Sequence, residues 1–249
     1  MVDKTESRFF ENHQHLRLNV HGGEEAVLRW YVDVQVTLAA ALGMDIPDRL
    51  LDDAGPYYQR VSASLPSLPL ALRVDGARRA AREGIFSSAA LIDLYSQAYA
   101  AGGNEGSIGT DAAQLRTAYV DPDPAARVAA IRALWGEDAQ IPYDRQVLTA
   151  YAAARIPAGD QFSGDAAPLI AAMLAAGLDL DAARWSDVVD EGDAGWGMLA
   201  VGLPNAKQPV SNNAIDSFSD NDSSTGRART GLLVAGLAGL GRISSGTRN

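Results

Sequence analysis

The sequence predicts an all-α protein built from antiparallel helical hairpins, arranged either as a solenoid-like stack or as a compact multi-helix domain. From Glu24 onward, apolar residues recur at three- and four-residue spacing, which places them along one face of successive helices. Proline, glycine and small polar residues interrupt this pattern at short intervals, as they do at helix ends. Such short connections favour antiparallel neighbours.

Composition agrees with this class and excludes several functions. Hydrophobic residues make up 47% of the 249 residues but aromatic residues only 7%, so alanine, leucine and valine supply most of the apolar surface. Alanine has the highest helix propensity of all residues. A net charge of −10 repels phosphate backbones and anionic lipids, so we expect no nucleic-acid partner. The absence of cysteine excludes disulfides, thiolate nucleophiles and cysteine-ligated metals.

The first 23 residues differ from the rest of the chain. Residues 15–20 alternate polar and apolar side chains, which predicts that residues 1–23 form a short extended arm. The start is polar and has no secretory signal, which favours a cytoplasmic location, or a periplasmic one for a processed chain. The longest apolar stretch, 231–241, is far shorter than a membrane span, so we expect no transmembrane segment.

Residues 24–203 are predicted to form one helical domain. Its most regular helix is expected to begin after Gly23 and to end at Gly43. Further along, Ser87 or Ser88 and then Thr110 are predicted N-caps. The remaining helices are expected to open near residues 45, 56, 67, 121, 142, 163 and 179, where aspartate, serine or proline suits a helix start.

The C-terminal part is predicted to have three segments. Residues 204–228 are rich in serine, asparagine and aspartate, which indicates a polar loop around one helical turn at 215–218. Residues 229–243 are predicted to hold a last helix that packs on the helical domain through Leu, Val, Ala and Gly alone. Residues 244–249 are expected to be a frayed tail.

No sequence signature of catalysis is present. The chain lacks a Gly-x-Ser-x-Gly elbow, a phosphate-binding loop, a dinucleotide fingerprint and a His-Glu-x-x-His helix. His13, His15 and His21 have no carboxylate placed to complete a metal site, so we predict no metal and no cofactor. The acidic run 190–193 is interpreted as a loop, and 220–226 fails the calcium-loop pattern because Thr225 occupies the glycine position.

Two groups of residues form a candidate interaction surface. Tyr57 and Tyr58 are adjacent, and neighbouring helical residues point about 100° apart, so at least one of them is expected to be exposed. Exposed tyrosine is typical of binding surfaces. Arg78, Arg79 and Arg82 lie in the densest basic cluster and suit an anion or an acidic partner. The alternative for the arginines is a solvated helix face in an acidic protein.

These observations favour a helical scaffold or protein-interaction module without intrinsic catalysis, with an unidentified protein partner. One alternative is an all-helical enzyme whose site is assembled from distant acidic residues and histidines; a pocket holding carboxylates would favour it. A second alternative is a small-molecule carrier with an apolar cavity of about 300 Å³ or more between helices. The small side chains of the last helix suit one wall of such a cavity.

Overall fold

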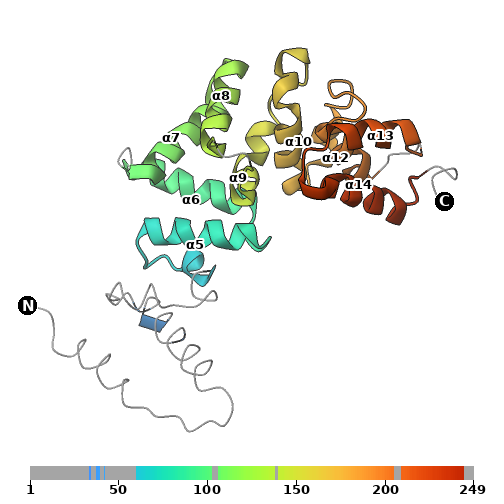
Figure 1. Cartoon of the computed structure of the whole chain (residues 1–249). Helices are drawn as coiled ribbons and strands as arrows, with labels where there is room; N and C mark the ends of the chain where they lie inside the picture. The colour runs from blue at the N-terminus through green and yellow to red at the C-terminus, as the bar shows by residue number, and fades with distance from the viewer. Residues whose placement is uncertain are drawn as a thin grey trace, which may run out of the picture. The chain divides into compact units, whose positions relative to one another are not determined.

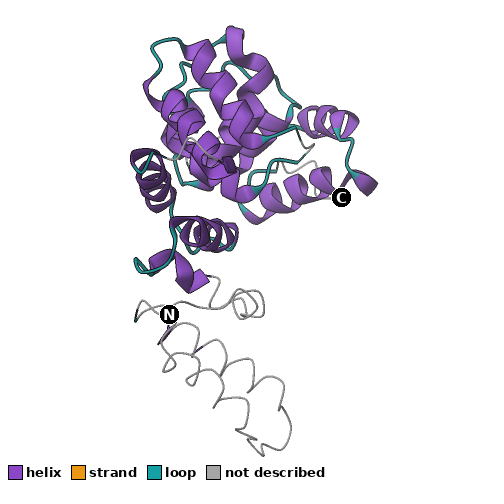
Figure 2. Cartoon of the chain, turned by 90° about the vertical axis from the view of Figure 1, so that its left-hand side faces the viewer, coloured by secondary structure: helices purple, strands orange, loops and turns teal. Residues whose placement is uncertain are grey.

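The computed structural model describes residues 60–102, 106–137, 140–204 and 209–243, together with Val34, Leu38, Ala39 and Leu42. In this part of the chain the protein is all-α, as predicted, with helices joined by turns and loops (Figure 2). The one extended pairing in the described ranges is an isolated bridge between Val210 and Ile243. The predicted arm 1–23 lies outside the described residues. The chain divides into two compact units, Met1–Phe86 and Ser87–Asn249.

In the first unit the described elements are a short 3-10 helix, η2 (Ser62–Ser64), and α5 (Leu70–Arg82), which contact each other. As expected, α5 follows Pro69, whose ring suits a helix start. The chain leaves α5 at Gly84, where a φ of 72° favours glycine because it has no Cβ.

The second unit holds the remaining helices; α6 to α10 and α12 to α14 are labelled in Figure 1. Their bounds are α6 (Ser88–Ala100), α7 (Gly106–Val120), α8 (Pro124–Trp135), α9 (Tyr143–Ala153), η3 (Asp160–Asp165), α10 (Ala166–Ala175), α11 (Asp179–Ala183), α12 (Ala194–Gly202), α13 (Asn212–Asn221), η4 (Thr225–Arg227) and α14 (Ala228–Gly239).

Several predicted helix starts are confirmed by their hydrogen bonds. The Ser87 hydroxyl accepts from the Ala90 backbone N–H at 3.3 Å, capping α6. The Asp123 carboxylate accepts from the Ala125 N–H at 3.0 Å, and Pro124 occupies the first turn of α8. Each cap satisfies an N–H that has no partner inside its own helix.

The main hydrophobic core surrounds α10, which packs on α9, α11 and α12. Trp185 and Ile170 are fully buried there. Trp135 is buried as well, and its indole N–H donates to the Thr149 hydroxyl at 2.9 Å. A smaller cluster joins α12 to α13 and α14 around the buried Phe218. Helix α12 therefore lies between the two clusters.

Two predicted boundaries are wrong. Thr110 does not cap a helix; α7 begins four residues earlier, at Gly106, and the Thr110 hydroxyl donates back to the Gly106 carbonyl. In the predicted polar loop 204–228, ten residues form α13 instead of a single turn. The Ser211 hydroxyl caps α13, and its apolar residues are buried against α14 and α12. Tertiary burial thus stabilises a helix whose composition favours a loop.

No helix in the described ranges is long and apolar enough to cross a membrane. The arrangement of the helices, as a solenoid-like stack or as a compact multi-helix domain, stays a prediction. The same holds for the location of the protein in the cell.

Candidate binding groove

The predicted basic surface lies on α5, in the first unit. Arg79 and Arg82 are exposed and Arg78 is half-buried. Each of the three takes part in a polar or electrostatic interaction within the chain. Tyr57 and Tyr58, the other half of this surface, lie outside the described residues. Binding of an anion or an acidic partner to this surface stays a prediction.

The acidic run of the sequence lies in an exposed turn. Asp190, Glu191 and Asp193 are all exposed in the turn before α12, as the loop interpretation predicts. In the described ranges no three His, Asp or Glu side chains gather closely enough to hold a metal ion. The three histidines lie outside the described residues.

A groove opens in the second unit where the main core meets the smaller C-terminal cluster. Its volume is about 640 Å³, and most of its surface is apolar. Helices α10 and α12 supply most of one side, including Ala171 and Met198. Helix α14 supplies Leu232 and Leu233, and α13 supplies Phe218. A cavity of this size and composition is typical of ligand sites, which are mostly apolar with a few polar groups.

Small residues on α12 give the groove its form. A Cβ added to Gly197 would lie 2.5 Å from Cε2 of Phe218, so only glycine lets that ring lie against the helix. A Cβ on Gly202 would lie 3.0 Å from Cδ1 of Leu174. The Phe218 ring also contacts Trp196, with ring centroids 6.3 Å apart. These contacts hold α13 close to α12 while leaving the adjacent groove open.

The α14 side of the groove is apolar on its outer surface as well as its inner one. Leu233 is buried at 5% exposure, but its neighbour Leu232 is 74% exposed. No charged residue occurs from Thr230 to Gly241. A helix with apolar residues on all sides is normally buried. The exposed apolar face of α14 is therefore unusual for a helix at the protein surface.

A hydrogen-bonded turn fixes the start of α14. The Asp222 carboxylate accepts from the Ser224 N–H at 2.9 Å and hydroxyl at 2.5 Å. It also accepts from the Thr230 N–H and hydroxyl, each at 2.8 Å. The Ser224 hydroxyl accepts from the Arg229 N–H at 3.1 Å. These donors, the Ser224 hydroxyl first among them, hold the pKa of Asp222 well below its usual value because they favour the ionised form.

The Arg242 guanidinium fixes the other end of α14 to α12. It donates to the carbonyls of Ala200 at 2.8 Å, Val201 at 3.1 Å and Leu203 at 2.6 Å, and to that of Pro204 at 3.4 Å. The first three carbonyls lie in the last turn of α12 and just beyond it, where a helix lacks internal donors. A cation is also favoured there by the helix dipole. Helices α12 and α14, on the two sides of the groove, are thus fastened together.

The polar side chains that line the groove are two neutral amides and one guanidinium, and all three offer N–H donors. They are the side chains of Gln140, Gln146 and Arg229, and no carboxylate is among the lining residues that the structure describes. The Gln146 amide donates to the Ile141 carbonyl at 3.4 Å. Among the described residues, the Arg229 guanidinium and the Gln140 amide make no hydrogen bond or ion pair. In the described ranges the groove therefore has a cation on its border and no acid among its lining residues.

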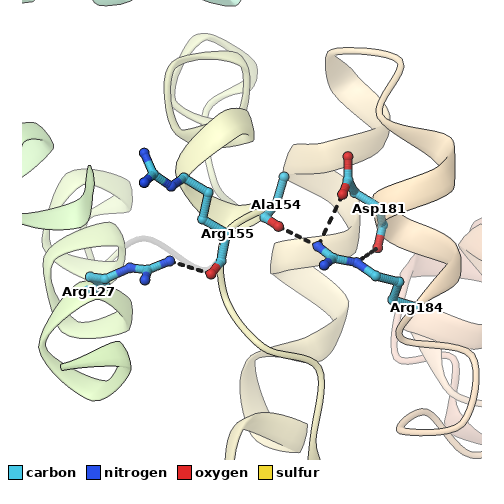
Figure 3. A network of polar contacts seen from close by, with 5 residues as sticks. All are labelled: Arg127, Ala154, Arg155, Asp181 and Arg184. Atoms are coloured by element: carbon cyan, nitrogen blue, oxygen red, sulfur yellow. Dashed lines mark hydrogen bonds and ion pairs between the residues drawn. The ribbon is translucent and has the colours of Figure 1, made fainter. Parts of the chain in front are cut away.

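Other arginines of the second unit have structural roles, as Figure 3 shows at the end of α9. Arg127 donates to the Arg155 carbonyl, and Arg184 donates to the Ala154 carbonyl while forming an ion pair with Asp181 at 3.1 Å. These cations satisfy the carbonyls at a helix C-terminus, the end that attracts positive charge. Burial and the nearby Arg155 charge lower the pKa of Arg127 from its usual value.

No protein-family model, curated protein or solved structure matches this chain. The last helix lines an apolar groove, as the carrier alternative expects, but the lining by α10 and α12 was not predicted from the sequence. The available signal was the density of small residues in 166–176 and 194–202, which also fits close helix packing.

Proposed function

We propose that this chain is a non-catalytic helical binding module whose groove receives the apolar face of an amphipathic helix from a partner protein. The observation that carries the proposal is the open apolar groove beside the exposed Leu232. Helix-in-groove recognition uses such a site, with apolar anchors at i, i+3, i+4 and i+7 filling a groove between helices. An incoming helix would cover both the groove and the outer face of α14.

The free energy gained by burying apolar surface favours an apolar occupant. Leu232 exposes 74% of its surface, and burying a leucine side chain stabilises a complex by about 1.5–3 kcal/mol. The groove of about 640 Å³ has room for several apolar side chains of a ligand. The two amides and one guanidinium on the border of the groove suit orientation of a bound ligand more than catalysis of a reaction.

The enzyme alternative receives no support from this groove. General acid–base catalysis needs a titratable group within hydrogen-bond reach of the substrate. The part of the groove's lining that the structure describes contains neither a carboxylate nor a histidine. The acidic residues that sequence reasoning singled out lie exposed in a turn and do not line it.

The carrier alternative is the second candidate, and the groove's volume favours it. About 640 Å³ exceeds the 300 Å³ or so expected for a small-molecule site, and α14 lines it. An amphipathic carboxylic acid such as dodecanoate is the suitable probe for this candidate. Its saturable binding, measured by calorimetry and abolished by filling the groove, would replace the protein-partner proposal.

The test places a photo-crosslinking amino acid at position 232 in the full chain and exposes it to lysate of the source cells. Position 180 is the matched control, because Leu180 is 77% exposed on α11 and does not line the groove. We expect one protein to crosslink from position 232 and not from 180. A synthetic peptide covering the crosslinked segment is then titrated against purified variants by fluorescence anisotropy.

Two variants connect that binding to the groove. Ala171→Trp fills the space between α10 and α12 and is expected to abolish peptide binding. Leu232→Glu is expected to weaken it about tenfold or more, because the burial of leucine is lost. Ala129→Trp on the exposed face of α8 and Leu180→Glu are the controls, and both should bind normally. Equal crosslinking from 232 and 180, or undiminished binding by Ala171→Trp, would refute the proposal.

A further inference from the structure

Arg229 is the one arginine of the described second unit whose guanidinium has no interaction. The others form hydrogen bonds, ion pairs or ring contacts: Arg116, Arg127, Arg132, Arg145, Arg155, Arg184, Arg227 and Arg242. The chain has 31 acidic residues and 21 basic ones, so partners for a cation are plentiful. An exposed arginine without one, on the border of a groove, is therefore informative.

The position of Arg229 is also unfavourable for its own helix. It is the second residue of α14, whose first turn contains no acidic residue of its own, although the Asp222 carboxylate from the preceding turn accepts from the Thr230 N–H. The N-terminal end of a helix carries partial positive charge, so a cation there is repelled. Only its backbone N–H serves the fold, by donating to Ser224 at 3.1 Å. Within the described ranges the guanidinium itself makes no hydrogen bond, ion pair or ring contact.

We infer that the partner helix carries an acidic side chain that pairs with Arg229 when its apolar face enters the groove. This inference rests on the function proposed above. The groove's other polar groups, the amides of Gln140 and Gln146, also offer N–H donors, and no acid is among the described residues that line the site. An arginine fork matches a carboxylate with two parallel hydrogen bonds. The pair fixes the direction in which the helix lies along the groove, as charge complementarity does at other interfaces.

The test uses designed fluorescent peptides of about 16 residues, long enough to form an isolated helix. Each has leucine at i, i+3, i+4 and i+7, and a single glutamate moved through the positions that flank this face. Matched peptides carry glutamine or lysine in place of glutamate. Anisotropy titrations with the full chain compare the wild type, Arg229→Gln, Arg229→Glu and the control Arg116→Gln.

We expect glutamate at one flanking position to bind the wild type about threefold to tenfold more tightly than glutamine, as a partly exposed ion pair allows. Arg229→Gln should erase the difference, and Arg229→Glu should prefer the lysine peptide. The advantage should shrink as salt is raised, since the pair is near the surface. Arg116→Gln should behave as the wild type, because that side chain lies over Tyr99 and does not line the groove.

Two negative results have different meanings. If no apolar peptide binds the wild type, or if Ala171→Trp binds as well as the wild type, the groove function fails and the inference with it. If peptides bind and Ala171→Trp abolishes binding, but glutamate and glutamine peptides bind equally, only the pairing with Arg229 is refuted. The thermal midpoint of Arg229→Gln, expected to be unchanged or slightly raised, shows that any loss of binding is not a loss of folding.

Discussion

Replacing Arg242 by alanine removes the side chain that fastens the C-terminal helices to α12. Three of its hydrogen bonds, to the carbonyls of Ala200, Val201 and Leu203, are 3.1 Å or shorter. The Arg242 carbonyl also accepts from the Val210 N–H at 2.7 Å, so the segment is held from both sides. Alanine keeps that backbone bond and loses the aliphatic stem and the guanidinium.

The expected cost follows from these contacts. Each hydrogen bond from a charged donor contributes about 1.5–3 kcal/mol to stability. The three bonds share one side chain, and water replaces part of what is lost near the surface, so the contributions do not add. We therefore expect Arg242→Ala to lower the free energy of unfolding by about 2–3 kcal/mol. Arg242→Lys keeps the charge but not the fork, and should recover less than half of this.

Urea denaturation followed by circular dichroism measures the loss, and native-state hydrogen exchange locates it. Protection should fall first in α13 and α14, including the buried Leu237. Arg116→Ala is the matched control, because its guanidinium is 4.9 Å from the Tyr99 ring centre; removing that contact should cost about 1 kcal/mol or less. A loss below about 0.5 kcal/mol for Arg242→Ala, the range of neutral surface changes, would refute the reasoning.

Three further predictions concern the fold around the groove. Thr149→Val leaves the buried Trp135 indole N–H without an acceptor and should cost about 1–3 kcal/mol in urea denaturation; Thr149→Ser, which retains a hydroxyl, should cost less. Gly197→Ala should cost about 1–3 kcal/mol because its Cβ collides with a ring of α13. Gly231→Ala, with nothing within 4 Å, should instead raise the thermal midpoint. The folded-state pKa of Asp222 is lowered, so its stabilising effect is complete above its unfolded pKa of about 4 and is lost as pH falls toward the folded value. The wild type should therefore lose stability between about pH 4 and pH 2 more steeply than Asp222→Asn. An equal loss of stability in the two proteins over this pH range would contradict this.

Local sequence signals predicted the helices well where a single residue controls a helix end. Ser87 and the Asp123-Pro124 pair act within their own turn, so their effect needs no knowledge of the fold. Thr110 misled the prediction because a threonine hydroxyl also bonds to the carbonyl four residues earlier inside a helix. The distinction depends on whether residues 106–109 are helical. In the structure Gly109 is buried and Ile108 is half-buried, which the sequence alone does not reveal.

The candidate site was much less predictable than the helices. The basic cluster on α5 is conspicuous in the sequence because its arginines are close together along the chain. The groove brings together residues from 140 to 233, each unremarkable alone. Arg229 differs from the other described arginines of the second unit in that its guanidinium makes no hydrogen bond, ion pair or ring contact. The lack of a tertiary contact cannot be recognised from the sequence.

The sequence by itself determined that this chain is helical, because the spacing of apolar residues and the turn residues between helices act over a few positions. It also determined the acidic charge and the lack of catalytic motifs. Tertiary structure decided which helices meet, that a polar segment folds as α13, and that α14 keeps one apolar face uncovered beside a groove. These outcomes depend on packing between residues far apart in the chain, such as Phe218 against Gly197, which local propensity does not encode.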